Sequence, residues 1–506
     1  MSDKTNNLKL NPLEKAISYI APVWGAKRLS LKAAIQQARL YYDAARVDRL
    51  GGGWTAFNQT ADGTDSSERD RIRARARDLE RNSDIVNASV HALVQNVVGT
   101  GIKPQARIRL KNGKFDKKLN RQLEALWKIW QEKQADITGH DTFYGLQQMA
   151  LRRFIVDGEI FMMSPYLKVK KGIPLRVQLL EADYVDSSVL GDNILSGVKV
   201  DNYHRPLSYY FYNSVPARYG FSTQSSEVEA YKVKHLYLKK RPHQVRGISE
   251  LAPVLMRIRD IEQFLEAEIV AQRMAACFAL FIKTPNQMNY LAGRTQDTQS
   301  GQLLDSIEPG MIHTLRPGED VATAEPRRNA GTAHEFTRMS LRRIGAGQGL
   351  SYEMVSRDNS QANYSSARQN HLEDRKTFKP LQEYIVTSMC KPIWRDFVRA
   401  AVLSGDINIP NFWNEPEKYY ECEFVAPGWT WIDPSKDVKA STQELKSGMS
   451  TLSHVCGQQG KDWTEVLEQA AEEKQYAEQL GLNLDIYNPD PLPEGGDEVD
   501  DDNKQK

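Results

Sequence analysis

The sequence is poor in cysteine and contains no long apolar run. Its 506 residues include four cysteines, Cys277, Cys390, Cys422 and Cys456, and no two of them form a C-x-x-C pair. This spacing argues against a disulfide framework and a zinc knuckle, and it fits a reducing compartment. No segment approaches the roughly 18 apolar residues that cross a bilayer, and the polar first ten residues lack a signal-peptide core. We therefore expect a soluble protein that is not secreted.

The chain also lacks an excess of charge of either sign. Lys and Arg total 67 and Asp and Glu total 65, which gives a formal net charge of +2. A protein that coats nucleic acid or membrane surfaces through its overall charge is thereby excluded. Any contact with nucleic acid must come from local patterning.

Recognisable catalytic motifs are missing as well. The phosphate-binding pattern G-x-x-x-x-G-K-[ST], a G-x-G-x-x-G after a strand and the nucleophile elbow G-x-S-x-G do not occur. His334-Glu335 starts an H-E-x-x-H pattern, but Arg338 stands where a zinc site needs its second histidine. We expect no enzyme activity, catalytic residue, cofactor or metal ion. A metal-dependent nuclease or another DNA-processing subunit stays open as the alternative, because carboxylate-based nucleases have inconspicuous motifs.

Hydrophobic periodicity predicts an α+β protein that is mainly helical. Helices are expected at Leu29–Val47, Arg69–Val98 and Phe115–Gln134, a strand at Ile102–Leu110, and a small sheet between Gly158 and Leu238 with strands at Ile160–Met163, Leu175–Leu180, Gly197–Val200 and Leu207–Tyr212. The helix that begins at Arg69 carries six arginines among its first thirteen residues. It is either a solvated helix with local ion pairs or a basic surface that meets acidic groups of a neighbouring subunit or nucleic-acid phosphate.

The second half of the chain predicts long helices separated by polar segments. A rod-like helix is expected to begin at Ser249, with the apolar stripe Leu251, Leu255, Ile258, Ile261, Leu265 and Ile269. An aperiodic excursion at Pro285–Glu325 precedes a helix at Ala333–Ile344. A polar segment at Ser356–Ser366 precedes a helix at Ala367–Leu403, in which Pro380 and Pro392 should produce kinks, and further helices follow up to Leu482. The acidic end of the chain is expected to be disordered.

Seven segments stand out together in the sequence. They are Tyr41–Arg46 with Arg49 and Trp54; Arg75–Asn82 with Asn96–Ile102; Asp157–Phe161; Arg241–Ser249; Gly349–Asp358 with Asn363–Arg368; Trp431–Lys436; and Gly448–Thr451. In this order they resemble the lambda-like family of tailed-bacteriophage portal proteins. The resemblance covers about residues 30–482.

The resemblance implies a ring, generally of twelve subunits, that forms a channel at one capsid vertex for DNA packaging and ejection. The implied partners are double-stranded DNA bound without sequence preference, the terminase large subunit, capsid and scaffold proteins and a head-tail adaptor, with no membrane. The expected location is the virion, with host cytoplasm during assembly.

The family architecture assigns parts to the chain by resemblance. These are an N-terminal arm (1–29), wing (30–245), stem helix (246–278), clip (279–332), second stem helix (333–347), wing return (348–436), crown (437–482) and disordered acidic tail (483–506). The expected DNA-channel loop contributes Ser356, Arg357, Asn359, Ser360, Gln361, Asn363, Tyr364, Ser365 and Ser366. The expected stem-helix site residues are Leu255, Ile258, Glu262, Glu266 and Arg273.

Overall fold

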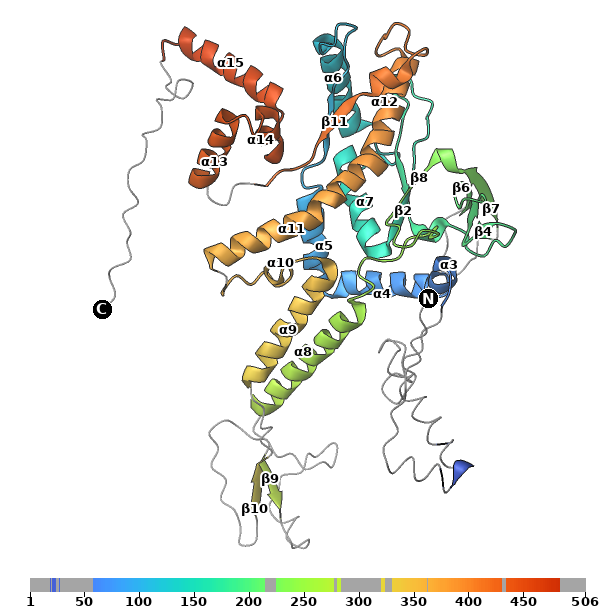
Figure 1. The fold of residues 1–506 in the computed structure, drawn as a ribbon, viewed down its shortest axis with the longest axis vertical. Helices are drawn as coiled ribbons and strands as arrows, with labels where there is room; N and C mark the ends of the chain where they lie inside the picture. Colours follow the sequence, from blue (N-terminus) through green and yellow to red (C-terminus); the bar gives the residue numbers. More distant parts are fainter. Residues whose placement is uncertain are drawn as a thin grey trace, which may run out of the picture. The chain divides into compact units, whose positions relative to one another are not determined.

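The computed structural model describes most of the chain after residue 57. The described ranges are 58–213, 224–276, 280–283, 320–323, 330–361, 363–429 and 434–482, with a few positions before residue 58. The predicted helix at 29–47, most of the excursion at 285–325 and the acidic tail lie outside them. The described part is α+β and mainly helical, which confirms the predicted fold class (Figure 1).

The helices fall into a group before the small sheet and a group after it. The first group is α3 (Ala61–Asp65), α4 (Arg69–Asn82), α5 (Asp84–Val97), α6 (Lys117–Lys133) and α7 (Phe143–Asp157). The second is α8 (Leu255–Ala276), α9 (Ala330–Gln348), α10 (Tyr352–Ser356), α11 (Tyr364–Ile385), α12 (Lys391–Ser404), α13 (Pro434–Lys446), α14 (Leu452–Gln458) and α15 (Trp463–Gln479).

The described strands form four small antiparallel sheets. They are β1 (Lys103–Ala106), β2 (Glu159–Met163), β3 (Gln178–Leu180), β4 (Ile194–Leu195), β5 (Val198–Val200), β6 (Pro206–Tyr212), β7 (Ser225–Glu229), β8 (Val233–Tyr237), β9 (Leu280–Lys283), β10 (Asp320–Thr323) and β11 (Cys422–Val425). The strand orders are β3-β2-β8, β4-β5-β6-β7, β10-β9 and β1-β11.

The structure corrects three predicted boundaries. The arginine-rich stretch is two helices, because Ser83 ends α4 and caps α5 by accepting a hydrogen bond from the Val86 amide. The rod begins at Leu255 rather than at Ser249, since turns occupy residues 250–254. The strand expected at Ile102–Leu110 is limited to β1, and residues after it form a tight hairpin.

The predicted long helix at 367–403 is present and begins three residues earlier, at Tyr364. Pro380 lies inside α11, and Pro392 lies in the first turn of α12. A single π-helical turn at Val386–Cys390 joins the two helices.

The main core is built from the helices around a cluster of aromatic side chains. Trp127 and Trp130 of α6 contact Phe143 of α7 and Phe397 of α12, with ring centroids 5.0–5.7 Å apart. A second, smaller core lies within the sheets, where Phe161 of β2 packs edge-on against Phe211 of β6 at 5.4 Å. Aliphatic side chains make up most of the main core around these rings.

A buried ion cluster joins the helical core to the sheets. Glu159, fully buried at the start of β2, accepts hydrogen bonds from the guanidinium of Arg246 at 2.6–3.0 Å and from the Gly247 amide at 2.9 Å. Arg73 of α4 and His235 of β8 each donate to the same carboxylate at 3.1 Å. Both oxygens of Glu159 thereby accept several hydrogen bonds, which is the condition for burying a charge.

The pKa directions show which members of this cluster are charged. Burial by itself would raise the pKa of Glu159, but the charge of Arg246 and the hydrogen bond from His235 outweigh it and hold that pKa well below its usual range. Burial lowers the pKa of His235, so its imidazole is neutral and its Nε2–H donates to Glu159. The cluster therefore consists of one carboxylate, two guanidiniums and a neutral imidazole.

The arginines of α4 divide by helical spacing. Arg69, Arg73 and Arg77 recur every four residues on one inward face, while Arg71, Arg75 and Arg81 are exposed. Arg77 donates to Asp157 at 2.7 and 2.8 Å and to Asp183 at 2.6 Å. Half of the arginine run thus neutralises acids of the same chain from the inward face, while the exposed Arg71 and Arg81 form the predicted local ion pairs with Glu68 and Asp78.

Replacing Glu159 with Gln should destabilise the protein strongly. The variant leaves Arg246 buried without a counter-charge, and losing one partner of a buried ion pair costs about 3–5 kcal/mol of unfolding free energy. Thermal or urea unfolding followed by circular dichroism measures the loss.

The matched control is Glu423→Gln, which breaks the exposed Arg107–Glu423 pair and should cost about 0–1 kcal/mol. Because the pKa of Glu159 is lower in the folded than in the unfolded state, its stabilisation is present above about pH 4.5 and is lost as the pH falls further. The Gln variant should lack this acid dependence. Equal stability of Glu159→Gln and wild type would contradict the role of the cluster.

Candidate functional site

The polar segment at 356–366 is a turn between two helices rather than one long loop. Ser356 ends α10, and Tyr364, Ser365 and Ser366 form the first turn of α11, so the non-helical part begins at Arg357 and ends at Asn363. Arg357 has a left-handed backbone with φ of 58° and caps α10. The exposed positions among the described residues of the segment are Arg357, Asn359, Ser360, Gln361, Asn363, Ser365 and Ser366. The segment therefore presents polar groups on a short, defined turn.

Asp358 organises the centre of the turn. Its carboxylate accepts hydrogen bonds from the Ser360 amide at 3.0 Å and from the Tyr352 hydroxyl at 3.0 Å. Two hydrogen bonds from Ser360 lower the pKa of Asp358 to about 2, and the bond from the side chain has a larger effect than the bond from the backbone. Asp358 is therefore ionised throughout the physiological range and offsets the charge of the neighbouring Arg357.

The end of the turn is held by a capping box. The Asn363 side chain accepts a hydrogen bond from the Ser366 amide at 2.8 Å, and the Ser366 hydroxyl accepts one from the Asn363 amide at 3.1 Å. Gln361 accepts a hydrogen bond from Arg338 of α9 at 2.5 Å. The sequence predicts a mobile segment because it has few apolar anchors. In the structure, hydrogen bonds rather than apolar contacts hold the described part of the turn, and its mobility stays a prediction.

The predicted stem residues occupy two different environments along α8. Leu255 and Ile258 are buried in the main core, and Glu262 is half-buried, whereas Glu266 and Arg273 are exposed. Phe264 contacts Phe336 of α9 with ring centroids 4.8 Å apart, so α8 and α9 run side by side (Figure 1). The rod is anchored at its beginning and leaves the core toward its end.

The apolar stripe of α8 continues beyond the part that this chain buries. Ile261 is buried, but Leu265 is 36% exposed and Ile269 is 52% exposed. On α9, Phe336 and Met339 are also exposed, the latter to 51%. The α8–α9 pair therefore presents apolar side chains that its own chain does not cover within the described residues.

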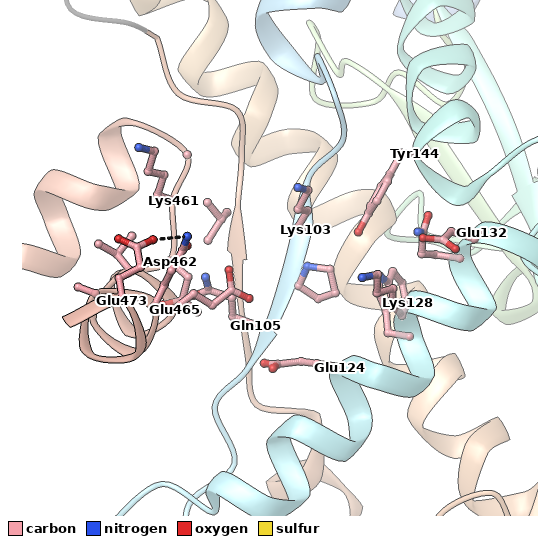
Figure 2. Close-up of a pocket in the computed structure, with 18 residues that line it drawn as sticks. Lys103, Gln105, Glu124, Lys128, Glu132, Tyr144, Lys461, Asp462, Glu465 and Glu473 are labelled. Atoms are coloured by element: carbon pink, nitrogen blue, oxygen red, sulfur yellow. Dashed lines mark hydrogen bonds between the residues drawn. The ribbon is translucent and has the colours of Figure 1, made fainter. Parts of the chain in front are cut away.

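A cleft of about 820 Å³ lies between the β1–α6 region and α15 (Figure 2). Glu124 and Lys128 line one side, and Asp462, Glu465 and Glu473 line the other. Burial raises the pKa of Glu124 even though its carboxylate accepts a hydrogen bond from the Ala106 amide at 2.8 Å. Sequence reasoning missed this cleft because residues on its two sides are more than 300 positions apart.

The described residues contain no group of three or more His, Cys, Asp and Glu side chains that could hold a metal ion. Within the same ranges, no helix is long and apolar enough to cross a membrane.

Three of the segments with family resemblance converge on the buried ion cluster. Glu159 comes from the Asp157–Phe161 segment, Arg246 from Arg241–Ser249, and Arg77 of Arg75–Asn82 binds the adjacent Asp157. These residue patterns therefore serve to build the fold. Another segment, Gly349–Asp358, supplies Ser351, whose amide and hydroxyl donate to Asp374 at 2.7 Å each.

The sequence profile of the family described as "Phage portal protein, lambda family" matches residues 48–382, which is more than half of the chain. The chain therefore belongs to the lambda family of phage portal proteins. The predicted family is confirmed, and this membership gives no support to the nuclease alternative.

Relatives match over most of their own length. The chain is 24% identical over 460 residues to a "Probable portal protein" of Halomonas phage phiHAP-1, with 87% of each chain covered. It is 22% identical over 481 residues to the "Portal protein" of Escherichia phage N15 and 21% identical over 477 residues to "Portal protein B" of Escherichia phage lambda, and 89% of each of these relatives is covered, against 85% and 86% of this chain.

Solved structures of gene transfer agent particles are also similar to this chain. A structure titled "Neck of empty GTA particle computed with C6 symmetry" matches with a TM-score of 0.45 and 12% identity, covering 74% of this chain and 89% of the other. A neck titled as computed with C12 symmetry matches with a TM-score of 0.42 and 12% identity, covering 81% and 96%.

Removing the cap of α11 should loosen the turn. Asn363→Ala leaves the Ser366 amide without its acceptor, and such a cap contributes about 1 kcal/mol to helix stability. Hydrogen exchange at the first turn of α11, read by mass spectrometry, should become faster. The control is Ser365→Ala at an exposed neighbouring position. Equal protection in both variants would show that the capping box does not hold the turn.

Proposed function

We propose that this chain assembles into a ring, generally of twelve subunits, that forms the DNA channel at one vertex of a phage capsid. The observation that carries the proposal is the match of residues 48–382 to the portal family. The ring would admit DNA during packaging and release it during ejection. It would belong to the virion and would assemble in the host cytoplasm.

The uncovered apolar side chains of α8 and α9 support a neighbouring subunit as their partner. Leu265 and Ile269 continue the stripe that starts in the core, and Phe336 and Met339 lie exposed on the adjacent helix. When a second copy of the chain covers such exposed apolar side chains, their removal from water stabilises the association of the two copies. In a ring, each subunit contributes two different faces, so a head-to-tail contact closes by rotation.

The charge balance of the turn at 357–363 supports weak contact with moving DNA. Arg357 is offset by the ionised Asp358, while Asn359, Ser360 and Gln361 offer exposed uncharged groups. Such groups contact phosphate oxygens without reading bases. Contacts that neutralised many phosphates would instead make DNA adhere and depend steeply on salt. This turn, with the first turn of α11, is our candidate for the DNA-channel loop.

The remaining assignments follow the family architecture. We assign the wing to residues 30–245 with its return at 348–436, the stem to α8 and α9, the clip to residues between them, and the crown to α13, α14 and α15. The clip would dock the terminase large subunit and later a head-tail adaptor, and the wing would meet capsid and scaffold proteins. The role proposed is structural, with no catalytic step, cofactor or metal ion.

A charged residue on the exposed stripe of α8 should prevent ring assembly. Ile269→Asp places a carboxylate where a neighbouring subunit would bury an apolar side chain, and desolvating that charge costs several kcal/mol. Native mass spectrometry should show subunits in place of closed rings. The far-ultraviolet circular dichroism of the subunit should be unchanged because Ile269 lies outside the chain's own core.

The matched control is Gln263→Asp, which adds the same charge at an exposed polar position of the same helix. Rings of Ile269→Asp that equal the wild type in number and stability would place the subunit interface elsewhere. A wild-type protein that never forms closed rings would overturn the proposed function itself.

Added cations on the turn should slow DNA translocation. Asn359→Lys with Ser365→Lys adds two charges per subunit at exposed positions and leaves the Asn363 cap intact. Each new phosphate contact steepens the slope of log K for DNA binding against log salt concentration by about 0.9. Packaging in vitro should therefore be slow at low salt and recover as salt rises.

The neutral control places Gln at the same two positions and should package at the wild-type rate. Electron microscopy of the rings verifies assembly in both variants. If the Lys variant packages like the Gln variant at low salt, the turn does not touch DNA.

A further inference from the structure

A strongly basic hairpin connects β1 to α6. The fifteen residues from Arg107 to Arg121 contain seven basic residues and one acidic residue, Asp116. None of these residues belongs to the turn at 357–363 or to any other predicted site. The net charge of the whole chain does not reveal this local excess of positive charge.

The hairpin has a defined backbone. Arg109 pairs with Phe115 in an antiparallel bridge, and the Leu110 amide donates to the Lys114 carbonyl at 2.8 Å. Gly113 turns the chain with φ of 80°. The base is fixed to α6, because the Ile108 amide donates to the Asn120 side chain at 3.1 Å and the Ile108 side chain is buried. The cations are therefore displayed on an ordered support.

Two of the seven cations are already neutralised within the chain. Arg107 pairs with Glu423 at 3.1 Å, and Arg121 pairs with Glu468 at 2.7 Å. The other five are exposed and form no ion pair with any residue in the described ranges; they are Arg109, Lys111, Lys114, Lys117 and Lys118.

The dipole of α6 adds to the positive potential of the hairpin, and Asp116 is the one carboxylate among its residues. Lys117 and Lys118 occupy the first turn of α6, where the helix dipole is positive. The carboxylate of Asp116 is engaged in capping this helix, since it accepts a hydrogen bond from the Leu119 amide at 3.1 Å. Arg109 stacks over Phe115 at 4.4 Å, which covers one face of the hairpin's aromatic ring. The exposed surface is thus a dense group of cations.

We propose that this basic hairpin binds the phosphates of double-stranded DNA. Five unpaired cations on one short support match a polyanion with closely and regularly spaced charges. The choice of DNA over another polyanion rests on the proposed function. The turn at 357–363 is charge-balanced and suits DNA that slides, whereas the hairpin suits DNA that is held. The chain therefore carries two DNA contacts of opposite electrostatic character.

Duplex binding by the full-length protein tests the proposal. Lys111→Gln, Lys114→Gln and Lys118→Gln are combined, and a fluorescent duplex is titrated from about 50 to about 200 mM salt. The variant should bind on the order of tenfold more weakly at the low-salt end, and its salt slope should fall by about 0.9 for each phosphate contact that is lost.

The matched control removes three cations that are paired with carboxylates. Lys199, Arg205 and Lys232 are replaced with Gln; they pair with Glu227, Asp201 and Glu229 on exposed surface. This control should keep wild-type affinity. An equal loss in both triple variants, or no loss in either, would overturn the hairpin as a DNA site.

A polyglutamate peptide is the second probe. Hairpin-dependent binding of this peptide as tight as that of the duplex would overturn DNA as the partner and favour an acidic protein. Failure of the proposed function is distinguished by native mass spectrometry of the same preparation. Closed rings without hairpin-dependent DNA binding refute only the inference, and hairpin-dependent binding by a protein that never closes a ring refutes only the proposed function.

Discussion

The structure depends on burying one carboxylate with all of its partners. Glu159 of β2 joins this strand to α4, β8 and the segment before α8, because each of these three supplies a donor to its carboxylate. No single partner would compensate for the loss of water around the charge. Close backbone approach is part of the same arrangement, since a Cβ on Gly158 would lie 2.1 Å from the Ile248 carbonyl carbon. The ion cluster thereby fixes the position from which the α8 rod starts.

Periodicity in the sequence predicted most helices and the sheet region, because local hydrophobic patterns report which face is buried. It missed the division at Ser83, since both halves of the stretch have helical spacing and only the cap separates them. It could not assign the inward arginines either. Arg73 and Arg77 have acidic partners about 80 residues away, and no local pattern reveals such pairing.

The candidate site was predicted less completely than the fold. The polar composition of residues 356–366 located the turn, but composition is silent about the hydrogen bonds of Asp358 and the Asn363 cap. The helical spacing from Leu255 to Ile269 predicts one continuous packing face. The structure divides it into a part buried by its own chain and a part left for another surface. The hydrophobic pattern does not predict the basic hairpin, because it indicates a strand up to Leu110 and a helix from Phe115.

The pairing of β1 with β11 sets the order of events during synthesis. Ala106 pairs with Cys422, so β1 cannot pair with β11 until the ribosome has added 316 more residues after Ala106. At about 5–20 residues per second, translation of that interval takes roughly 15–60 s. Until then, β1 has unpaired edge groups, and the Gln382 amide lacks the Pro427 carbonyl that it binds at 3.1 Å. A chain that terminates before residue 422 cannot complete this sheet, so prematurely ended products differ from full-length subunits before assembly begins.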